Sequence, residues 1–367
     1  MKRLLLVLAA SGVLAQCAWA GNDTKRGQAG ASELLINPWA RSSGWGGANA
    51  GNIRGVESMM LNVGGLAYVR RTDLIASYSR WMAGSGISIN TIGFGQRLSS
   101  TGVLGVTLMN VNLGDAIETT YEQPEGTGRT FSPSLFNLGL AYSQKFSDRI
   151  TAGLVLRTIY QSISNASALG VAFDLGIQYQ TGKDNRFKFG VALRNVGPKM
   201  VYGGEGLSFK GTRDAIGLTV SNRTAPFELP ALLNIGASYD VLKTDQVRLT
   251  PAFTFTSNSY TRDQLQPGLE IGFLRDMFQV RSGYTLYQDF LKSESAATDV
   301  NTGFSAGATF QLMVGKGKVE ATDVETTAGN SGAVKSGEGK SILGIDFSYR
   351  STNLWGGTYT VGLVYTL

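Results

Sequence analysis

Hydrophobic and polar residues alternate along most of the chain beyond residue 71. In the segment 357–367, Tyr359, Val361, Leu363, Tyr365 and Leu367 fall on one face, and small, mostly polar residues fall on the other. A period of two is typical of a β-strand with one apolar face. A segment of this length, about 9–11 residues, crosses a bilayer at a tilt. One such segment fits an amphipathic strand of a soluble protein equally well, so the remaining segments decide between the two.

Fourteen segments between residue 72 and the last residue carry strand signals. They are 72–80, 87–97, 102–113, 133–146, 149–164, 168–180, 186–197, 227–240, 246–258, 264–274, 277–288, 300–313, 340–350 and 357–367. Bacterial single-chain barrels have an even number of antiparallel strands, and a lipid-exposed sheet edge is not tolerated. The pattern predicts an all-β fold, a 14-stranded antiparallel transmembrane β-barrel in which 357–367 pairs with 72–80. A soluble β-sandwich is the alternative.

The connections between these segments mostly alternate in length. The long ones include 114–132, 198–226 and 289–299, as expected of extracellular loops. The connection 314–339 is long where a short periplasmic turn is expected, and its Gly, Ser, Thr and charge content predicts flexibility. Apolar residues in two of the outer loops suggest a contact surface for a protein partner, with a lid over the barrel as the alternative. The candidates are Tyr121, Phe131, Tyr202 and Phe209.

The first residues are typical of a secretory signal peptide. Lys2 and Arg3 precede an apolar run, and Ala18-Trp19-Ala20 matches a cleavage site. We therefore expect a signal peptide over 1–20, a plug segment over 21–71 and a barrel over 72–367, exported to the bacterial outer membrane. Cys17 follows Ala15-Gln16, which is unfavourable for a lipoprotein site.

Composition narrows the possible chemistry. The chain of 367 residues has no histidine and one cysteine, Cys17, so it lacks the usual general base and the usual zinc ligands. No paired-carboxylate motif stands out, so we expect no catalytic residues, no metal site, no cofactor and no enzymatic activity. The 48 glycines and only 16% charged residues suit strands that face lipid. The net charge of +6 comes without a basic cluster, so nucleic acid is not an expected partner, whereas outer-membrane lipids are.

Charged residues recur on the polar faces of the predicted strands. A charge that faces lipid at mid-depth costs about 2–4 kcal/mol, so we expect these side chains to point into the lumen. An ion-pair network that fills the barrel is favoured over a selectivity filter. The residues are Arg157, Asp174, Lys188, Arg194, Asp240, Glu270, Arg281, Asp346 and Arg350.

Residues 21–71 do not alternate, and part of this segment resembles a known family. Two motifs in it include Gly30, Ala31, Leu34, Ala40, Arg41, Gly44, Gly46, Gly47, Asn62, Gly65 and Leu66. These residues resemble the motifs of the PorV/PorQ-like outer-membrane barrels, relatives of the FadL fatty-acid transporter fold. Val63 and Gly64 replace the proline and alanine of the second motif. The resemblance implies a FadL-like barrel whose N-terminal segment lies inside, where Arg41 would need a carboxylate partner.

Two functions follow as expectations. The resemblance to the PorV/PorQ-like group implies a component of a protein secretion or assembly machine, type IX secretion-like, that binds other outer-membrane or surface proteins. The alternative is a FadL-like transporter of hydrophobic small molecules, which needs an apolar pocket beneath the outer loops.

Overall fold

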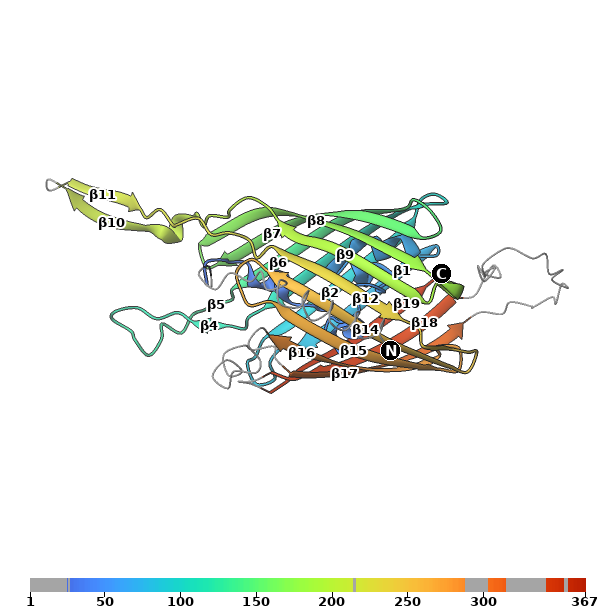
Figure 1. The fold of residues 1–367 in the computed structure, drawn as a ribbon. Coiled ribbons are helices and arrows are strands. Elements are labelled where there is room, and N and C mark those ends of the chain that lie inside the picture. The colour runs from blue at the N-terminus through green and yellow to red at the C-terminus, as the bar shows by residue number, and fades with distance from the viewer. Residues whose placement is uncertain (1–24, 26, 214–215, 288–302, 315–340, 353–355) are drawn as a thin grey trace, which may run out of the picture.

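The chain forms one closed β-barrel around an irregular N-terminal segment (Figure 1). The computed structural model describes residues 25, 27–213, 216–287, 303–314, 341–352 and 356–367. The barrel strands are β1 (Thr72–Arg80), β2 (Ser88–Arg97), β3 (Gly102–Asn112), β6 (Ser134–Lys145), β7 (Ile150–Ile163), β8 (Ala166–Thr181), β9 (Phe187–Val196), β12 (Leu232–Tyr239), β14 (Val247–Asn258), β15 (Gln264–Phe273), β16 (Phe278–Tyr287), β17 (Gly303–Val314), β18 (Ser341–Arg350) and β19 (Thr358–Thr366).

Every barrel strand is antiparallel to both of its neighbours, and β1 closes the barrel against β19. The closing register runs from Asp73 opposite Thr366 to Arg80 opposite Tyr359. The prediction of a 14-stranded antiparallel barrel closed by the last strand is confirmed. Closure removes the free sheet edge, so every strand has a backbone partner on both sides.

Side chains alternate between the two faces of the wall. On β1, Leu74 and Tyr78 are about half exposed, whereas Ile75, Ser77 and Ser79 are buried. The other strands repeat this pattern, so large apolar side chains point outward and small or polar ones point inward. This is the reverse of a soluble sandwich, in which the apolar face is the buried one. The aromatic residues Tyr142 and Tyr239 lie on the outward face.

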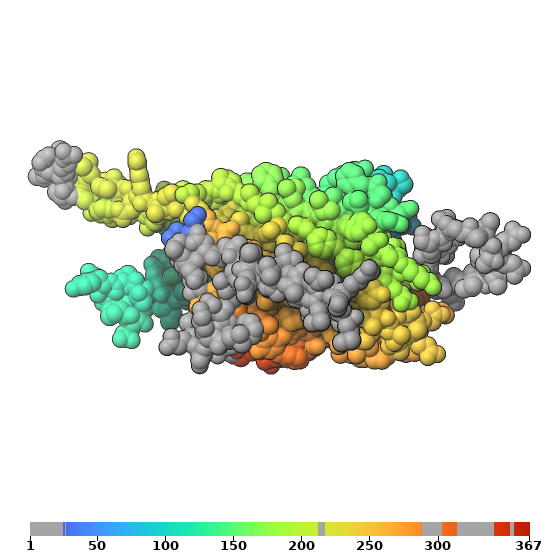
Figure 2. Space-filling model, in the orientation of Figure 1, coloured from blue at the N-terminus to red at the C-terminus, as the bar shows by residue number. Residues whose placement is uncertain are grey.

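The two ends of the barrel differ. The end that carries Leu367, here called the C-terminal end, has short turns such as the one between β2 and β3. The opposite end, the hairpin end, carries two hairpins, β4–β5 (Ala116–Ile117 and Thr130–Phe131) and β10–β11 (Ser208–Arg213 and Ile216–Ser221). Both extend beyond the barrel (Figures 1 and 2). The sequence pattern predicts these segments only as loops.

One predicted strand, 227–240, is too long. The structure begins β12 at Leu232, and residues 227–231 leave the wall. Pro230 has no N–H to donate to a strand ladder, and Phe227 instead exchanges backbone hydrogen bonds with Met200. The predicted signal peptide 1–20 and the connection 289–299 lie outside the described residues, as does all of 314–339 except Val314.

The barrel encloses residues 27–69, here called the inner segment. It contains short 3₁₀ turns at Ser32–Leu35, Val56–Met60 and Val63–Tyr68 and the helix α2 (Ala40–Gly44). Its residues bond to strands on opposite sides of the barrel, because Ser77 of β1 donates to the Pro38 carbonyl and Asn234 of β12 donates to the Leu61 carbonyl. The described lumen is therefore packed with protein.

Candidate functional site

The inner segment approaches the wall closely where glycines face each other. A Cβ added at Gly51 would lie 2.7 Å from the Gly236 carbonyl oxygen. Gly46 and Gly47 have φ values of +65° and +85°, which disfavour other residues. These contacts explain why a segment so rich in glycine fits inside a narrow barrel.

The expected plug-motif residues all lie in the inner segment. Asn62 has three bonds, since its side chain also accepts from the Gly64 N–H and donates to the Ala50 carbonyl. Leu34 and Leu66 are fully buried, and Arg41 lies in α2 beside the wall. The other motif positions are Gly30, Ala31, Ala40, Gly44, Gly46, Gly47 and Gly65, each buried or half-buried.

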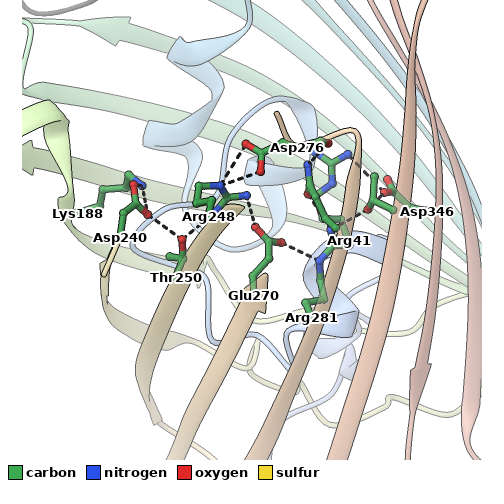
Figure 3. Close-up of polar contacts among 11 residues, drawn as sticks. Arg41, Lys188, Asp240, Arg248, Thr250, Glu270, Asp276, Arg281 and Asp346 are labelled. Carbon is green, nitrogen blue, oxygen red and sulfur yellow. Dashed lines mark hydrogen bonds and ion pairs between the residues drawn. The ribbon is translucent and has the colours of Figure 1, made fainter. Parts of the chain in front are cut away.

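The inward faces of β9, β12 and β14 to β18 carry most of the lumen charges and form the charged wall. Its first part runs through Lys188, Asp240, Thr250 and Arg248 (Figure 3). The Lys188 Nζ lies 2.8 Å from Asp240 Oδ2. The Thr250 hydroxyl donates to Asp240 and accepts from Arg248. One threonine thus joins two oppositely charged groups on neighbouring strands.

Glu270 is the centre of the charged wall. Its two carboxylate oxygens accept separately, Oε1 from Arg248 Nη2 at 2.7 Å and Oε2 from Arg281 Nε at 2.9 Å. Arg281 also donates to the Thr309 hydroxyl, which bonds to Asp346. Asp346 lies 3.4 Å from Arg41 Nη2, so the network reaches the inner segment (Figure 3). Polar contacts therefore link one strand to the next around the wall, and the network ends on α2.

The inward faces of β1, β2, β3, β6, β7 and β8 combine aliphatic residues and glycines with mostly uncharged polar residues, and we call them the apolar wall. Trp39, Met59 and Leu66 of the inner segment pack there against Val103 and Val155, all of them buried. One buried ion pair interrupts it, Arg157 with Asp174, at 2.7 Å.

The Arg157–Asp174 pair lies beside the irregularity between β8 and β9. The second oxygen of Asp174 accepts the backbone N–H of Asn195 at the point where the register shifts, between Phe173 and Leu175. A side-chain carboxylate thus holds the two strands together where the regular ladder is interrupted. The two remaining predicted lumen charges also point inward, because Arg194 donates to the Leu34 carbonyl and Arg350 to Thr285.

At the hairpin end, the apolar wall continues into a partly exposed patch that we call the mouth cluster. It is built from residues of β2, β3 and β6, from the connections next to β2 and β3 and from one residue of the inner segment. The members are Ile36, Trp81, Ile87, Ile89, Met109, Val111, Leu113 and Leu135. Directly beneath it, a cavity of about 10 Å³ lies between Trp39, Met59 and Met109, with Thr91 and Asn137 also lining it. A space of this size holds about one water molecule.

The predicted partner residues do not share one environment. Tyr121 is fully exposed, Phe209 is half exposed on β10, and Phe131 is half-buried. Tyr202 is half-buried, and its hydroxyl donates to Gln161 at 2.6 Å while its ring packs on Phe227. Gln161 in turn donates to Glu33 of the inner segment. Tyr202 therefore ties its loop to the inner segment through Gln161.

The sequence pattern does not predict three residues of the lumen, Arg248, Glu57 and Arg54. Arg248 occupies an inward position of the predicted strand 246–258, so the same alternation could have found it. Glu57 and Arg54 lie in the inner segment. Its sequence has no regular alternation of hydrophobic and polar residues, so it does not show which of its side chains are in contact. Among the described residues, no helix is long and apolar enough to cross a membrane, and no group of three or more metal-binding side chains occurs.

Comparisons with known proteins rest on the fold. No protein-family model matches the sequence, and no curated protein sequence is significantly similar. The CymD monoaromatic hydrocarbon channel has a similar structure, with a TM-score of 0.53 and 13% identity over 90% of this chain and 97% of that one. Two others align less closely. They are the Pseudomonas putida toluene transporter TodX (TM-score 0.48, 10% identity, 85% and 93% covered) and a Pseudomonas aeruginosa FadL homologue (0.45, 14%, 88% and 96%). The likeness to CymD establishes a shared barrel fold.

Proposed function

We propose that this chain is an outer-membrane channel for small hydrophobic molecules and is not an enzyme. The observation that carries the proposal is the mouth cluster, an apolar patch inside the barrel at its hairpin end. A polar lumen would offer no binding energy to a hydrocarbon, whereas burial of apolar surface contributes about 25 cal/mol per Å². The fold shared with CymD, a monoaromatic hydrocarbon channel, supports the same assignment. The outward apolar band fits a bilayer location.

The route from the mouth cluster leads along the apolar wall. A guest released by the cluster meets Trp39, Met59 and Met109, and the space between them is only about 10 Å³. Passage therefore requires these side chains, or the inner segment itself, to shift. Methionine side chains change rotamer easily, and dispersion contacts have no fixed geometry, so this side is the easier one to open.

Uptake of radiolabelled toluene by cells that lack other hydrocarbon channels would test the proposal. We expect Leu135→Glu, which places a charge in the mouth cluster, to reduce uptake at least fivefold at equal barrel abundance. Gln264→Glu is the matched control, because it adds the same charge at the hairpin end of the charged wall and should leave uptake unchanged. Equal uptake by the Leu135 variant and the wild type would refute the proposal.

A second candidate function rests on the hairpins. β10–β11 exposes Phe209, Leu218 and Val220 on a projection that the barrel does not need for closure. Exposed apolar patches often mark protein contacts. This feature supports a role as a component of a larger complex, as the resemblance to PorV/PorQ-like, type IX secretion-associated barrels implies. Phe209→Ser with Val220→Ser should then release co-purifying proteins, while toluene uptake should persist.

A further inference from the structure

A larger cavity opens at the C-terminal end, away from the mouth cluster. It has a volume of about 260 Å³ and lies between the inner segment and strands β1, β17, β18 and β19. This is close to the lower end of the sizes typical of small-molecule sites. Val56, Val69, Ile75 and Val364 give it an apolar side.

Three arginines also line this cavity. Arg41, Arg54 and Arg70 all line it, and the side chains of Arg54 and Arg70 are exposed. The Arg54 guanidinium lies over the Tyr68 ring, 4.5 Å from its centre, which fixes its position. Among the residues that the structure describes, neither Arg54 nor Arg70 forms an ion pair. Arg54 Nη2 donates to Gln180 Oε1 at 3.4 Å, and its other donors and those of Arg70 can receive an anion.

The carboxylates of the cavity are largely engaged elsewhere. Asp346 is bonded to Arg41 and Thr309, and Asp73 accepts from the Thr366 hydroxyl. Glu57 is the exception, because it is 5% exposed and its Oε2 has no hydrogen-bond partner. Burial raises the pKa of Glu57 to about 7 despite the opposing effect of Arg41. A neutral Glu57 can donate a hydrogen bond into the cavity, and its neutrality leaves the three arginines in excess of the two aspartates.

We propose that this cavity binds a small monocarboxylate with an apolar body, which enters from the C-terminal end. The guanidinium forks of Arg54 and Arg70 match the two oxygens of a carboxylate. The apolar side formed by Val56, Ile75 and Val364 receives the body of the ligand. The proposal goes beyond the proposed function, since the site differs in chemistry and position from the mouth cluster.

Benzoate and benzamide have nearly the same shape, but only benzoate is charged. Comparing their affinities therefore shows whether the cavity recognises the charge. We expect a saturation-transfer NMR titration of the full chain in detergent to show benzoate binding at least tenfold tighter than benzamide. The double variant Arg54→Gln, Arg70→Gln should lose at least tenfold in benzoate affinity. The double variant Arg71→Gln, Arg149→Gln is the matched control, since both arginines are exposed near the same end but do not line the cavity. Heat-modifiability on a gel verifies that each variant is folded.

The pH dependence adds a second readout. Benzoate binding should weaken from about pH 6 to about pH 8, because Glu57 ionises in this range and repels the ligand. Arg41, Arg281, Asp73 and Asp346 are the charged groups around Glu57. Glu57→Gln should bind benzoate with no such dependence.

The proposed site would be refuted if the protein bound benzamide as tightly as benzoate. It would also be refuted if the double variant at Arg54 and Arg70 bound benzoate as tightly as the wild type. Toluene uptake by that double variant should match the wild type, so the site and the proposed channel can fail independently.

Discussion

The two walls of the lumen hold the inner segment by different physics. The charged wall uses directional bonds, in which Glu270 accepts from Arg248 and Arg281 and the network ends on Arg41. The apolar wall adds packing, with Trp39 and Leu66 against aliphatic side chains, to separate hydrogen bonds such as those from Arg157 and Gln178 to inner-segment carbonyls. Buried ion pairs are costly to break because each broken pair leaves a desolvated charge, whereas apolar side chains can rearrange and still remain in contact. We therefore expect the charged wall to anchor the inner segment and the apolar wall to let it move.

The largest expected effect comes from the centre of the charged wall. Glu270→Ala leaves Arg248 and Arg281 buried without their shared carboxylate, and the expected loss is about 3–5 kcal/mol in the free energy of unfolding. Urea titration of the protein refolded into lipid vesicles measures it. Glu125→Ala, at an exposed position of the β4–β5 connection, is the control and should change stability by less than about 0.5 kcal/mol. A small effect at Glu270 would show that the network does not anchor the inner segment.

Glu57 lies next to the anchored part of the inner segment, so the pH dependence of stability tests how this part is held. Its folded-state pKa of about 7 exceeds the ordinary value of 4.5, so the folded state binds the proton more tightly than the unfolded state. Its contribution to stability therefore falls as the pH rises from about 4.5 to about 7. Glu57→Gln should match the wild type at pH 4 and exceed it by up to about 3 kcal/mol at pH 8. A constant difference between the two proteins across that range would contradict the assignment.

On the apolar wall, Met109→Ala tests whether packing can adapt. Met109 is buried, belongs to the mouth cluster and borders the small cavity, so its neighbours have room to relax. We expect a loss of about 2 kcal/mol, the lower end for such a truncation, and faster toluene uptake because the narrow point widens. The same vesicle unfolding and uptake assays measure both. Lower stability with unchanged uptake would place the route elsewhere.

The sequence predicts the strands of the barrel wall much better than the contacts of the inner segment. Alternation identifies the strands because each strand meets lipid on one face, and it marks Asp174 and Glu270 as inward. It does not show that Glu270 lies opposite Arg281, since that pairing depends on the register between β15 and β16. The inner segment has no period, because it touches protein on all sides. Its contacts, including the arginines of the C-terminal cavity, therefore emerge only from the three-dimensional structure.

The smallest expected effect concerns the polar tether above the apolar wall. The Tyr202 hydroxyl donates to Gln161, which donates to Glu33, so one loop at the hairpin end is tied to the inner segment. Tyr202→Phe removes this hydroxyl but keeps the ring contact with Phe227, 5.7 Å between centroids. A single hydrogen bond contributes about 0.5–1.5 kcal/mol, so global stability should fall by about 1 kcal/mol. If the apolar wall is the mobile one, amide exchange at residues 31–36 should rise more than at α2, which the charged wall still holds. Equal increases in both regions would mean that the inner segment moves as one body, and the distinction between the two walls would then fail.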